Sequence, residues 1–121
     1  MILFCFEAIY SSGAVSVGVP SGAVAYLQGL PGPPAGKVRI ALTDGRIFES
    51  REPMAALSER LAAGGERYLK ASALAGEIQV ALSVIYLVEQ DKPGGPTTVH
   101  LSPSLKAPSF TIAAPLKNLD F

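Results

Sequence analysis

Hydrophobic and polar positions alternate with a period of two along residues 38–42, the pattern of a strand with one buried face. Thr43-Asp44-Gly45 follows with the composition of a tight turn, and a second alternating segment begins directly after it. A three-residue loop with Gly45 in the left-handed region would pair Ile40 with Phe48 and turn Phe48 toward the core. The pattern therefore predicts a β-hairpin in this register.

The pattern becomes helical after residue 52. Met54, Leu57 and Leu61 are spaced at i, i+3 and i+7, which places them on one face of a helix. Pro53 suits the first turn, because its missing N–H would have no intrahelical partner there. Gly64-Gly65 is a typical C-terminal signal. We predict one short helix over about residues 53–63.

Most of the remaining chain predicts strands. Residues 2–10 are apolar on both alternations, which suits a central or interface strand, and short strands at 15–19 and 23–27 are separated by a Pro-Ser-Gly turn. Residues 29–36 are too rich in proline and glycine for regular structure, and residues 68–74 fit either a strand or a helix. The alternation over 77–90 is long for one strand, so a break near 82–84 is expected before strands at 97–101 and 110–112. The predicted class is α+β, mainly antiparallel β-sheet with one short helix.

The chain of 121 residues is predicted to form a single domain, residues 1–121, with an internal echo. A Val-x-Tyr-Leu segment at 24–27 returns at 84–87, an apolar alternation at 38–40 returns at 99–101, and a Pro-x-x-x-Leu segment at 53–57 returns at 115–119. The order is kept. We expect two related β-rich units over about 15–60 and 78–121, and the alternative is chance similarity between short β patterns.

The amino-acid composition favours self-association. The formal net charge is zero, 17% of residues are charged and 49% are hydrophobic, so the surface is thinly charged. A homo-oligomer, a dimer or higher species, is the simplest way to cover apolar surface that remains after folding. The apolar start before Glu7 is short for a signal peptide and no stretch reaches the length of a membrane helix, which favours a cytoplasmic protein with no membrane partner. Cys5 lies in an apolar run and is expected to be buried and inert.

Catalytic and metal-binding signatures are weak. With one histidine, His100, and one cysteine, the chain cannot build a zinc-type cluster, and we predict no metal and no cofactor. His100 and Ser102 share a strand face but lack a third member and an oxyanion loop. Glu49 and Glu52 could form an acid–base pair, but neighbouring arginines and the helix N-terminus account for them. We therefore predict no catalytic residue and no enzyme; a pocket that gathers His100 with a carboxylate would favour one.

The candidate residues for binding a ligand or partner are Lys37, Arg39, Lys70 and His100. The first three could form a basic patch, although interleaved acidic residues are also consistent with a salt-bridged, solvated face.

The order of segments resembles the LytTR family of DNA-binding domains of bacterial response regulators. In that family an Ile-Tyr strand, a strand ending in an Asp-Gly-type turn, a strand, a short helix and a basic segment follow in order; the corresponding segments here are 24–27, 38–45, 47–51, 53–62 and 68–72. The resemblance implies a β-rich bacterial DNA-binding domain. The basic motif differs, since Lys70 and Ala71 stand before Ser72 where the family has a basic pair, and Gly76 stands where it usually has Asn.

Two functions follow. The first is a non-catalytic module that self-associates and binds a partner protein or a small apolar ligand, which the low charge and apolar content favour. The alternative is a LytTR-like DNA-binding domain of a transcriptional regulator, with duplex DNA as its partner.

Overall fold

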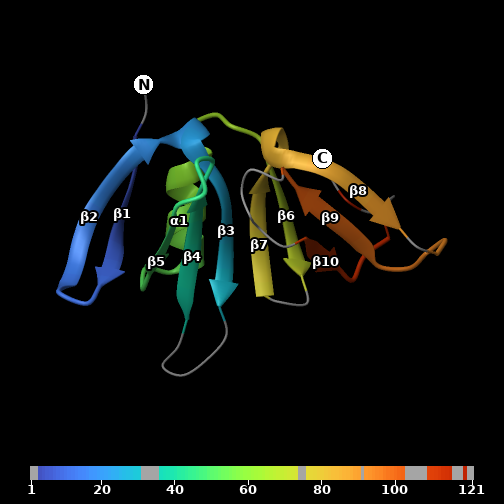
Figure 1. Cartoon of the computed structure of the whole chain (residues 1–121), viewed down its shortest axis with the longest axis horizontal. Helices are drawn as coiled ribbons and strands as arrows, with labels where there is room; N and C mark the ends of the chain where they lie inside the picture. Colours follow the sequence, from blue (N-terminus) through green and yellow to red (C-terminus); the bar gives the residue numbers. More distant parts are fainter. Residues whose placement is uncertain are drawn as a thin grey trace.

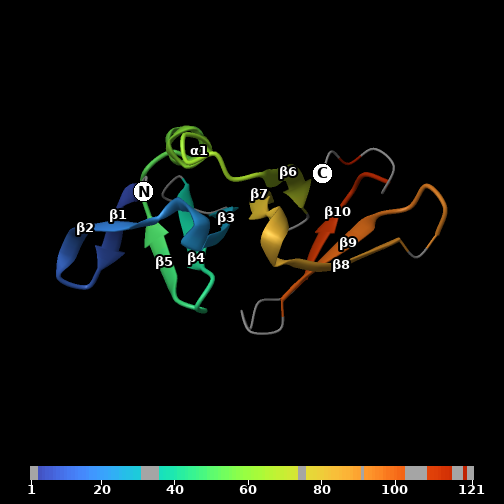
Figure 2. The same cartoon turned by 90° about the horizontal axis from the view of Figure 1, so that it is seen from above.

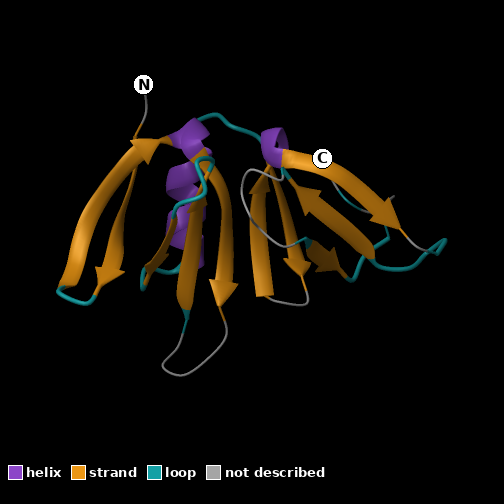
Figure 3. Ribbon diagram, in the orientation of Figure 1, coloured by secondary structure: helices purple, strands orange, loops and turns teal. Residues whose placement is uncertain are grey.

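The protein is described by a computed structural model that covers residues 3–30, 36–73, 76–90, 92–102, 109–115 and 119. It is mostly antiparallel β-sheet with one short α-helix, so the predicted α+β class is confirmed. Figure 3 shows strands along the whole molecule, with α1 packed on one side of them.

The strands within these ranges are short and follow one another closely. The order is β1 (Leu3–Tyr10), β2 (Gly13–Pro20), β3 (Val24–Leu30), β4 (Lys37–Leu42), β5 (Ile47–Ser50), α1 (Met54–Ala62), β6 (Tyr68–Ala73), β7 (Gly76–Ala81), β8 (Ile85–Gln90), β9 (Thr97–Leu101) and β10 (Phe110–Ile112). Two 3-10 helices, η1 (Ser21–Ala23) and η2 (Leu82–Val84), precede β3 and β8. The expected break at 82–84 is η2, and the ambiguous segment from residue 68 is a strand.

The strands form two sheets. β1 and β2 make a two-stranded ribbon, and the others form an eight-stranded sheet in the order β5-β4-β3-β7-β6-β10-β9-β8. In Figure 1 the ribbon lies at one end of the long axis and β8 lies toward the other. Residues 31–35 of the predicted proline- and glycine-rich loop and residues 116–118 of the C-terminal echo lie outside the described residues.

The β4–β5 hairpin has the predicted register. Ile40 pairs with Phe48, and the Leu42 N–H donates to the Arg46 carbonyl at 2.9 Å. Gly45 has φ 93°, the left-handed conformation that glycine adopts at little cost. Phe48 packs against the buried cluster, as the three-residue loop requires.

The helix begins and ends close to the predicted residues. Leu57 and Leu61 are fully buried and Met54 packs beside them. The helix ends at Ala62, and Gly65, which follows the turn at Ala63 and Gly64, has φ 80°, in agreement with a glycine C-terminal signal. Figure 2 shows α1 over the part of the molecule formed by β3, β4 and β5.

Two buried clusters fill the molecule. The first core is built from β1, β3, β4 and α1; its residues are Phe4, Phe6, Ala8, Val24, Leu27, Val38, Ile40, Leu42, Leu57 and Leu61. The second core is built mainly from β6 to β10, and Tyr26 of β3 reaches into it. The Tyr26 ring meets Phe110 edge to face, with centroids 5.2 Å apart, and burial raises the pKa of its hydroxyl. Tyr26 thus ties the N-terminal half of the chain to the C-terminal half.

Residues 2–10 were expected to form a central or interface strand; the structure contradicts the central position, because β1 belongs to a two-stranded ribbon, and the interface position stays a prediction. Phe4, Phe6 and Ala8 are buried on the first core, whereas Leu3 on the other alternation is 55% exposed. Cys5 shares that outer face and is exposed, so the prediction of a buried thiol was wrong. The reason is that one face of β1 packs on the first core, while nothing in the described residues covers the face that carries Leu3 and Cys5.

The two halves of the chain have the same order of elements. Each contains a hairpin, a 3-10 helix and three further antiparallel strands, β1 to β5 and β6 to β10. Gly13 and Gly76 are the first residues of β2 and β7, the second strands of the two hairpins, and both have φ 120°. The register of β3 on β4 shifts just after Val24, and that of β8 on β9 shifts just after Ile85.

Candidate functional site

The strand edges are the most distinctive surface of this molecule. Four described strands, β1, β2, β5 and β8, are hydrogen-bonded to a neighbour on one side only. β1 and β5 contact each other, whereas β2 and β8 each present one open edge. An open edge carries a row of backbone N–H and C=O groups that can pair with another strand. We call these surfaces the β2 edge and the β8 edge.

Most of the exposed large apolar side chains in the described ranges lie on the ribbon or on β8; on the ribbon, Val15 belongs to β2 and Leu3 and Tyr10 belong to its partner β1. On β8 they are Tyr86 and Leu87. Ile47 of β5 is the remaining one in the described ranges. Tyr86 is 71% exposed, an unusual position for a large aromatic residue beside an open edge.

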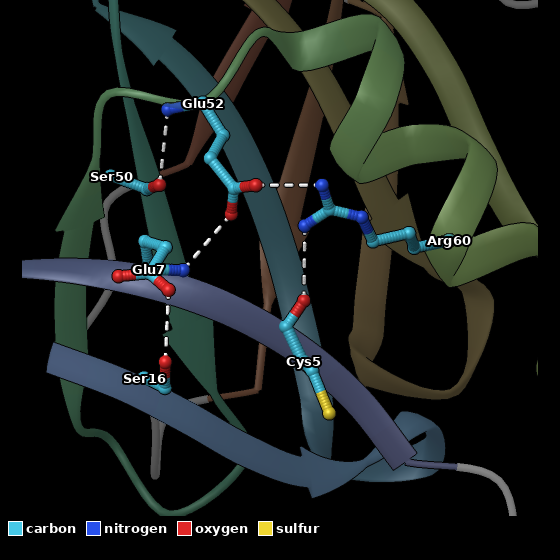
Figure 4. Close-up of polar contacts among 6 residues, drawn as sticks. All are labelled: Cys5, Glu7, Ser16, Ser50, Glu52 and Arg60. Atoms are coloured by element: carbon cyan, nitrogen blue, oxygen red, sulfur yellow. Dashed lines mark hydrogen bonds and ion pairs between the residues drawn. The ribbon is translucent and has the colours of Figure 1, made fainter.

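The outer edge of β1, by contrast, is closed by a clamp of side chains (Figure 4). Glu52 Oε2 accepts a hydrogen bond from the Glu7 N–H at 2.9 Å, and Arg60 Nη1 donates to the Cys5 carbonyl oxygen at 3.2 Å. Arg60 Nη2 lies 2.6 Å from Glu52 Oε1, so the two clamp residues are themselves an ion pair. The clamp joins β1 to α1 and to the end of β5 and satisfies backbone groups that β2 does not reach.

The clamp has a clear electrostatic signature. The Arg60 guanidinium, and then the Glu7 N–H, hold the pKa of Glu52 below its ordinary value, against the opposing effect of burial. Glu52 raises the pKa of Arg60 in turn. The Glu52 side chain is 20% exposed, so its charge is screened only in part.

Replacing Glu52 should loosen the ribbon. Glu52→Gln removes the ion pair but leaves an acceptor for Glu7, and we expect it to lower the free energy of unfolding by about 1 kcal/mol at neutral pH. Because the folded pKa lies below the ordinary 4.5, this contribution is present above that value and disappears as the pH falls through the folded pKa. Urea denaturation at neutral and at acid pH checks both parts.

The matched control is Glu59→Gln, a substitution of the same kind at an exposed position of α1. It should leave the unfolding free energy within about 0.5 kcal/mol. Equal stability of Glu52→Gln and the parent protein at neutral pH would show that the clamp does not hold the ribbon.

The basic residues predicted as a patch are not brought together. Arg39 pairs with Gln28, Gln28 with Ile78, and Ile78 with Ala71, so these four share one face of the sheet. Lys70 is the neighbour of Ala71 and therefore points to the opposite face. The predicted patch is split by the sheet.

Each of the candidate binding residues has a different setting. Lys37 Nζ lies 3.7 Å from Glu49 Oε1. The Arg39 guanidinium opposes the rise that burial causes in the pKa of the Tyr26 hydroxyl, and its Nε is buried without a hydrogen-bond partner. His100 Nε2 lies 2.5 Å from Glu89 Oε1, on an exposed face at the far end of the sheet. Glu49 forms an ion pair with Lys37 and Glu52 forms one with Arg60, so the two carboxylates have separate partners.

Lys70 lines a groove between α1, β6 and β7 with a volume of about 360 Å³. A second groove of about 420 Å³ lies beside the ribbon turn and is lined by Tyr10, Arg51 and Glu52 among others. Both are open to solvent and have charged residues in their walls, unlike the enclosed apolar pockets that hold most small ligands.

Sequence reasoning missed the clamp. Glu52 was assigned to the helix N-terminus, and no pattern in the sequence pointed to Arg60. The partners of the clamp are separated by up to 55 positions in sequence, and no local pattern marks them. The open edges were missed for the same reason, because pairing between distant strands decides which edges remain open.

Comparisons with protein-family models, with curated proteins and with solved structures found no match to this chain. Among the described residues there is no group of three or more His, Cys, Asp or Glu side chains arranged to hold a metal ion. No helix in the described part of the chain has the length and hydropathy needed to cross a membrane.

Proposed function

We propose that this protein is a non-catalytic interaction module that self-associates and binds a partner protein through the edges of its sheets. The observation that carries the proposal is the position of the exposed apolar residues: those of the ribbon and of β8 lie on or beside strands with an open edge.

The composition of β2 supports this function. Natural edge strands that must not associate usually carry charged residues, especially lysine, or are covered. β2 has the sequence GAVSVGVP, without a charged residue, and is interrupted only by Pro20 at its end. Its edge is therefore suited to strand addition, in which backbone hydrogen bonds supply affinity and side chains supply specificity.

A small apolar ligand is less well supported than a protein partner. The grooves of about 360 and 420 Å³ are open and carry Lys70, Glu77, Arg51 and Glu52 in their walls. An apolar molecule bound there would leave much of its surface in water.

The test is the mass of the protein in solution. We expect light scattering after size exclusion to give masses above the 12.6 kDa of one chain, rising as the concentration increases from about 1 to about 300 µM. A mass of one chain across this range would overturn the proposal.

DNA binding is the second candidate, and the observation that favours it is the order of elements. β3, the β4–β5 hairpin, α1 and β6 follow at the positions that the resemblance to LytTR domains requires. The charges argue the other way, because Lys37, Arg46 and Arg60 each face a carboxylate.

Fluorescence anisotropy with a labelled duplex separates the two candidates. DNA binding predicts micromolar or tighter affinity at low salt that weakens steeply as salt is raised, and that falls in Arg39→Ala and Lys70→Ala. An absence of binding at low salt would remove this candidate.

A further inference from the structure

The two halves of the chain meet at one antiparallel seam, between β3 and β7. Tyr26 pairs with Val80, Leu27 with Gln79 and Gln28 with Ile78. All six residues are buried, Val80 and Leu27 completely. The seam is therefore a closely packed pairing between one strand of each half of the chain.

Each half of the chain also has a strand that corresponds to one side of this seam. η1 directly follows β2 and precedes β3, and η2 directly follows β7 and precedes β8. Aligned on these 3-10 helices, β2 corresponds to β7 and β8 corresponds to β3. The register shifts after Val24 and after Ile85 fall at matching positions in this alignment. In this alignment Leu87 is the counterpart of Tyr26. The Val-x-Tyr-Leu match in the sequence had instead aligned Tyr86 with Tyr26, one residue away.

The two large exposed residues of β8 have counterparts that are buried in β3. Tyr26 is 1% exposed, whereas its counterpart Leu87 is 45% exposed. Ala25 is fully buried, whereas its counterpart Tyr86 is 71% exposed. The difference follows from pairing, because β3 lies between β4 and β7 while β8 is paired with β9 alone.

The backbone of β2 is oriented to accept a strand. The clamp shows that the Cys5 carbonyl and the Glu7 N–H point away from β2. In an antiparallel pair both partners of such a position turn their polar groups outward. Gly18 is the partner of Cys5 and Ser16 is the partner of Glu7, so both present N–H and C=O groups to the open edge.

We infer that copies of this chain join head to tail, with β8 of one copy pairing antiparallel to β2 of the next. The register is that of the internal seam, Leu87 with Val19, Val88 with Gly18 and Glu89 with Val17. This inference rests on the proposed self-association and specifies its geometry. We assign a second copy of this chain to each edge, because β8 and β2 correspond to β3 and β7. The chain already pairs β3 with β7 within itself.

The contact is heterologous and leaves an edge open at each end of the assembly. β2 and β8 lie at opposite ends of the long axis in both views (Figures 1 and 2). A dimer formed this way keeps one unused β2 edge and one unused β8 edge, so growth continues into a chain or closes into a ring. A symmetric dimer would instead use the same edge of both copies.

Two substitutions block one edge each. Leu87→Lys places a charge where the seam buries a side chain. Gly18→Pro removes an N–H that points to the open edge and is not bonded to β1. Pro20 of the same strand already lacks its N–H. Gly18→Lys is a second variant for this edge, since a Cβ there meets only Cys5 Sγ at 3.5 Å and Leu3 Cδ1 at 3.8 Å.

The decisive experiment mixes the two blocked proteins. Each variant alone should be monomeric in sedimentation velocity at concentrations where the parent protein forms dimers and larger species. Their equimolar mixture should give a dimer of one copy of each and nothing larger, because only one β8 edge and one β2 edge remain intact. Ile47→Lys, the same kind of change at the exposed apolar residue of β5, should assemble like the parent.

The outcomes separate the two proposals. A monomeric parent protein overturns both. A parent that associates while either blocked variant alone associates equally well, or while the mixture stays monomeric, overturns the head-to-tail pairing and leaves self-association standing. Circular dichroism of each variant verifies that loss of assembly is not loss of folding.

Discussion

Tyr26→Ala should cost about 3–5 kcal/mol of unfolding free energy, the usual range for removing a large buried aromatic side chain. Tyr26 is 1% exposed and its ring packs edge to face on Phe110. Because it extends from β3 into the second core, the cavity would open where the two halves of the chain meet. Stabilities of whole domains are about 5–15 kcal/mol, so the variant should be partly unfolded in dilute denaturant. Urea denaturation followed by far-ultraviolet circular dichroism measures the loss.

The matched control is Tyr86→Ala, which removes the same side chain from β8. Tyr86 is 71% exposed, so the free energy of unfolding should change by no more than about 0.5 kcal/mol. The comparison must be made at protein concentrations at which the parent is monomeric, because assembly would itself stabilise the fold. A loss below about 1 kcal/mol for Tyr26→Ala would contradict the tie between the two cores.

The contrast between these tyrosines marks how far the sequence could be read. Local patterns predicted the β4–β5 hairpin, its Gly45 turn, α1 and the break at η2, because spacing, turn residues and caps act over a few positions. The Val-x-Tyr-Leu match made Tyr26 and Tyr86 look equivalent. Their opposite exposures come from strand pairing, since β3 gained β7 as a neighbour and β8 has β9 alone among the described strands.

The candidate site was less predictable than the fold. Lys37, Arg39 and Lys70 were grouped by their type, but the register across β4, β3, β7 and β6 puts Lys70 on the opposite face from Arg39. Cys5 was expected to be buried because its neighbours are apolar, yet β1 packs its Phe4 and Phe6 face on β3, β4 and α1 and leaves the face of Cys5 exposed. Both differences arise from contacts between distant segments, which composition and periodicity do not encode.

Gly76→Ala should destabilise the protein by about 3 kcal/mol or more. Gly76 has φ 120°, where a side chain is strained by about 1–3 kcal/mol. A Cβ at this position would also lie 2.2 Å from the Gly29 carbonyl oxygen, a backbone atom of β3 that cannot swing aside. The substitution therefore adds a clash at the end of the β3–β7 seam to the strain of the turn. Thermal and urea unfolding give the combined cost.

Gly13→Ala isolates the cost of the turn, because Gly13 has the same φ of 120° after the other hairpin and no atom lies within 4 Å of its added Cβ. It should lose about 1–3 kcal/mol from strain alone. The excess loss in Gly76→Ala measures how rigidly β3 and β7 are held against each other. Equal losses of stability would mean that β3 and β7 can move apart at no free-energy cost. The corresponding pairing between β8 and β2 of two copies would then discriminate little between strands of different shape.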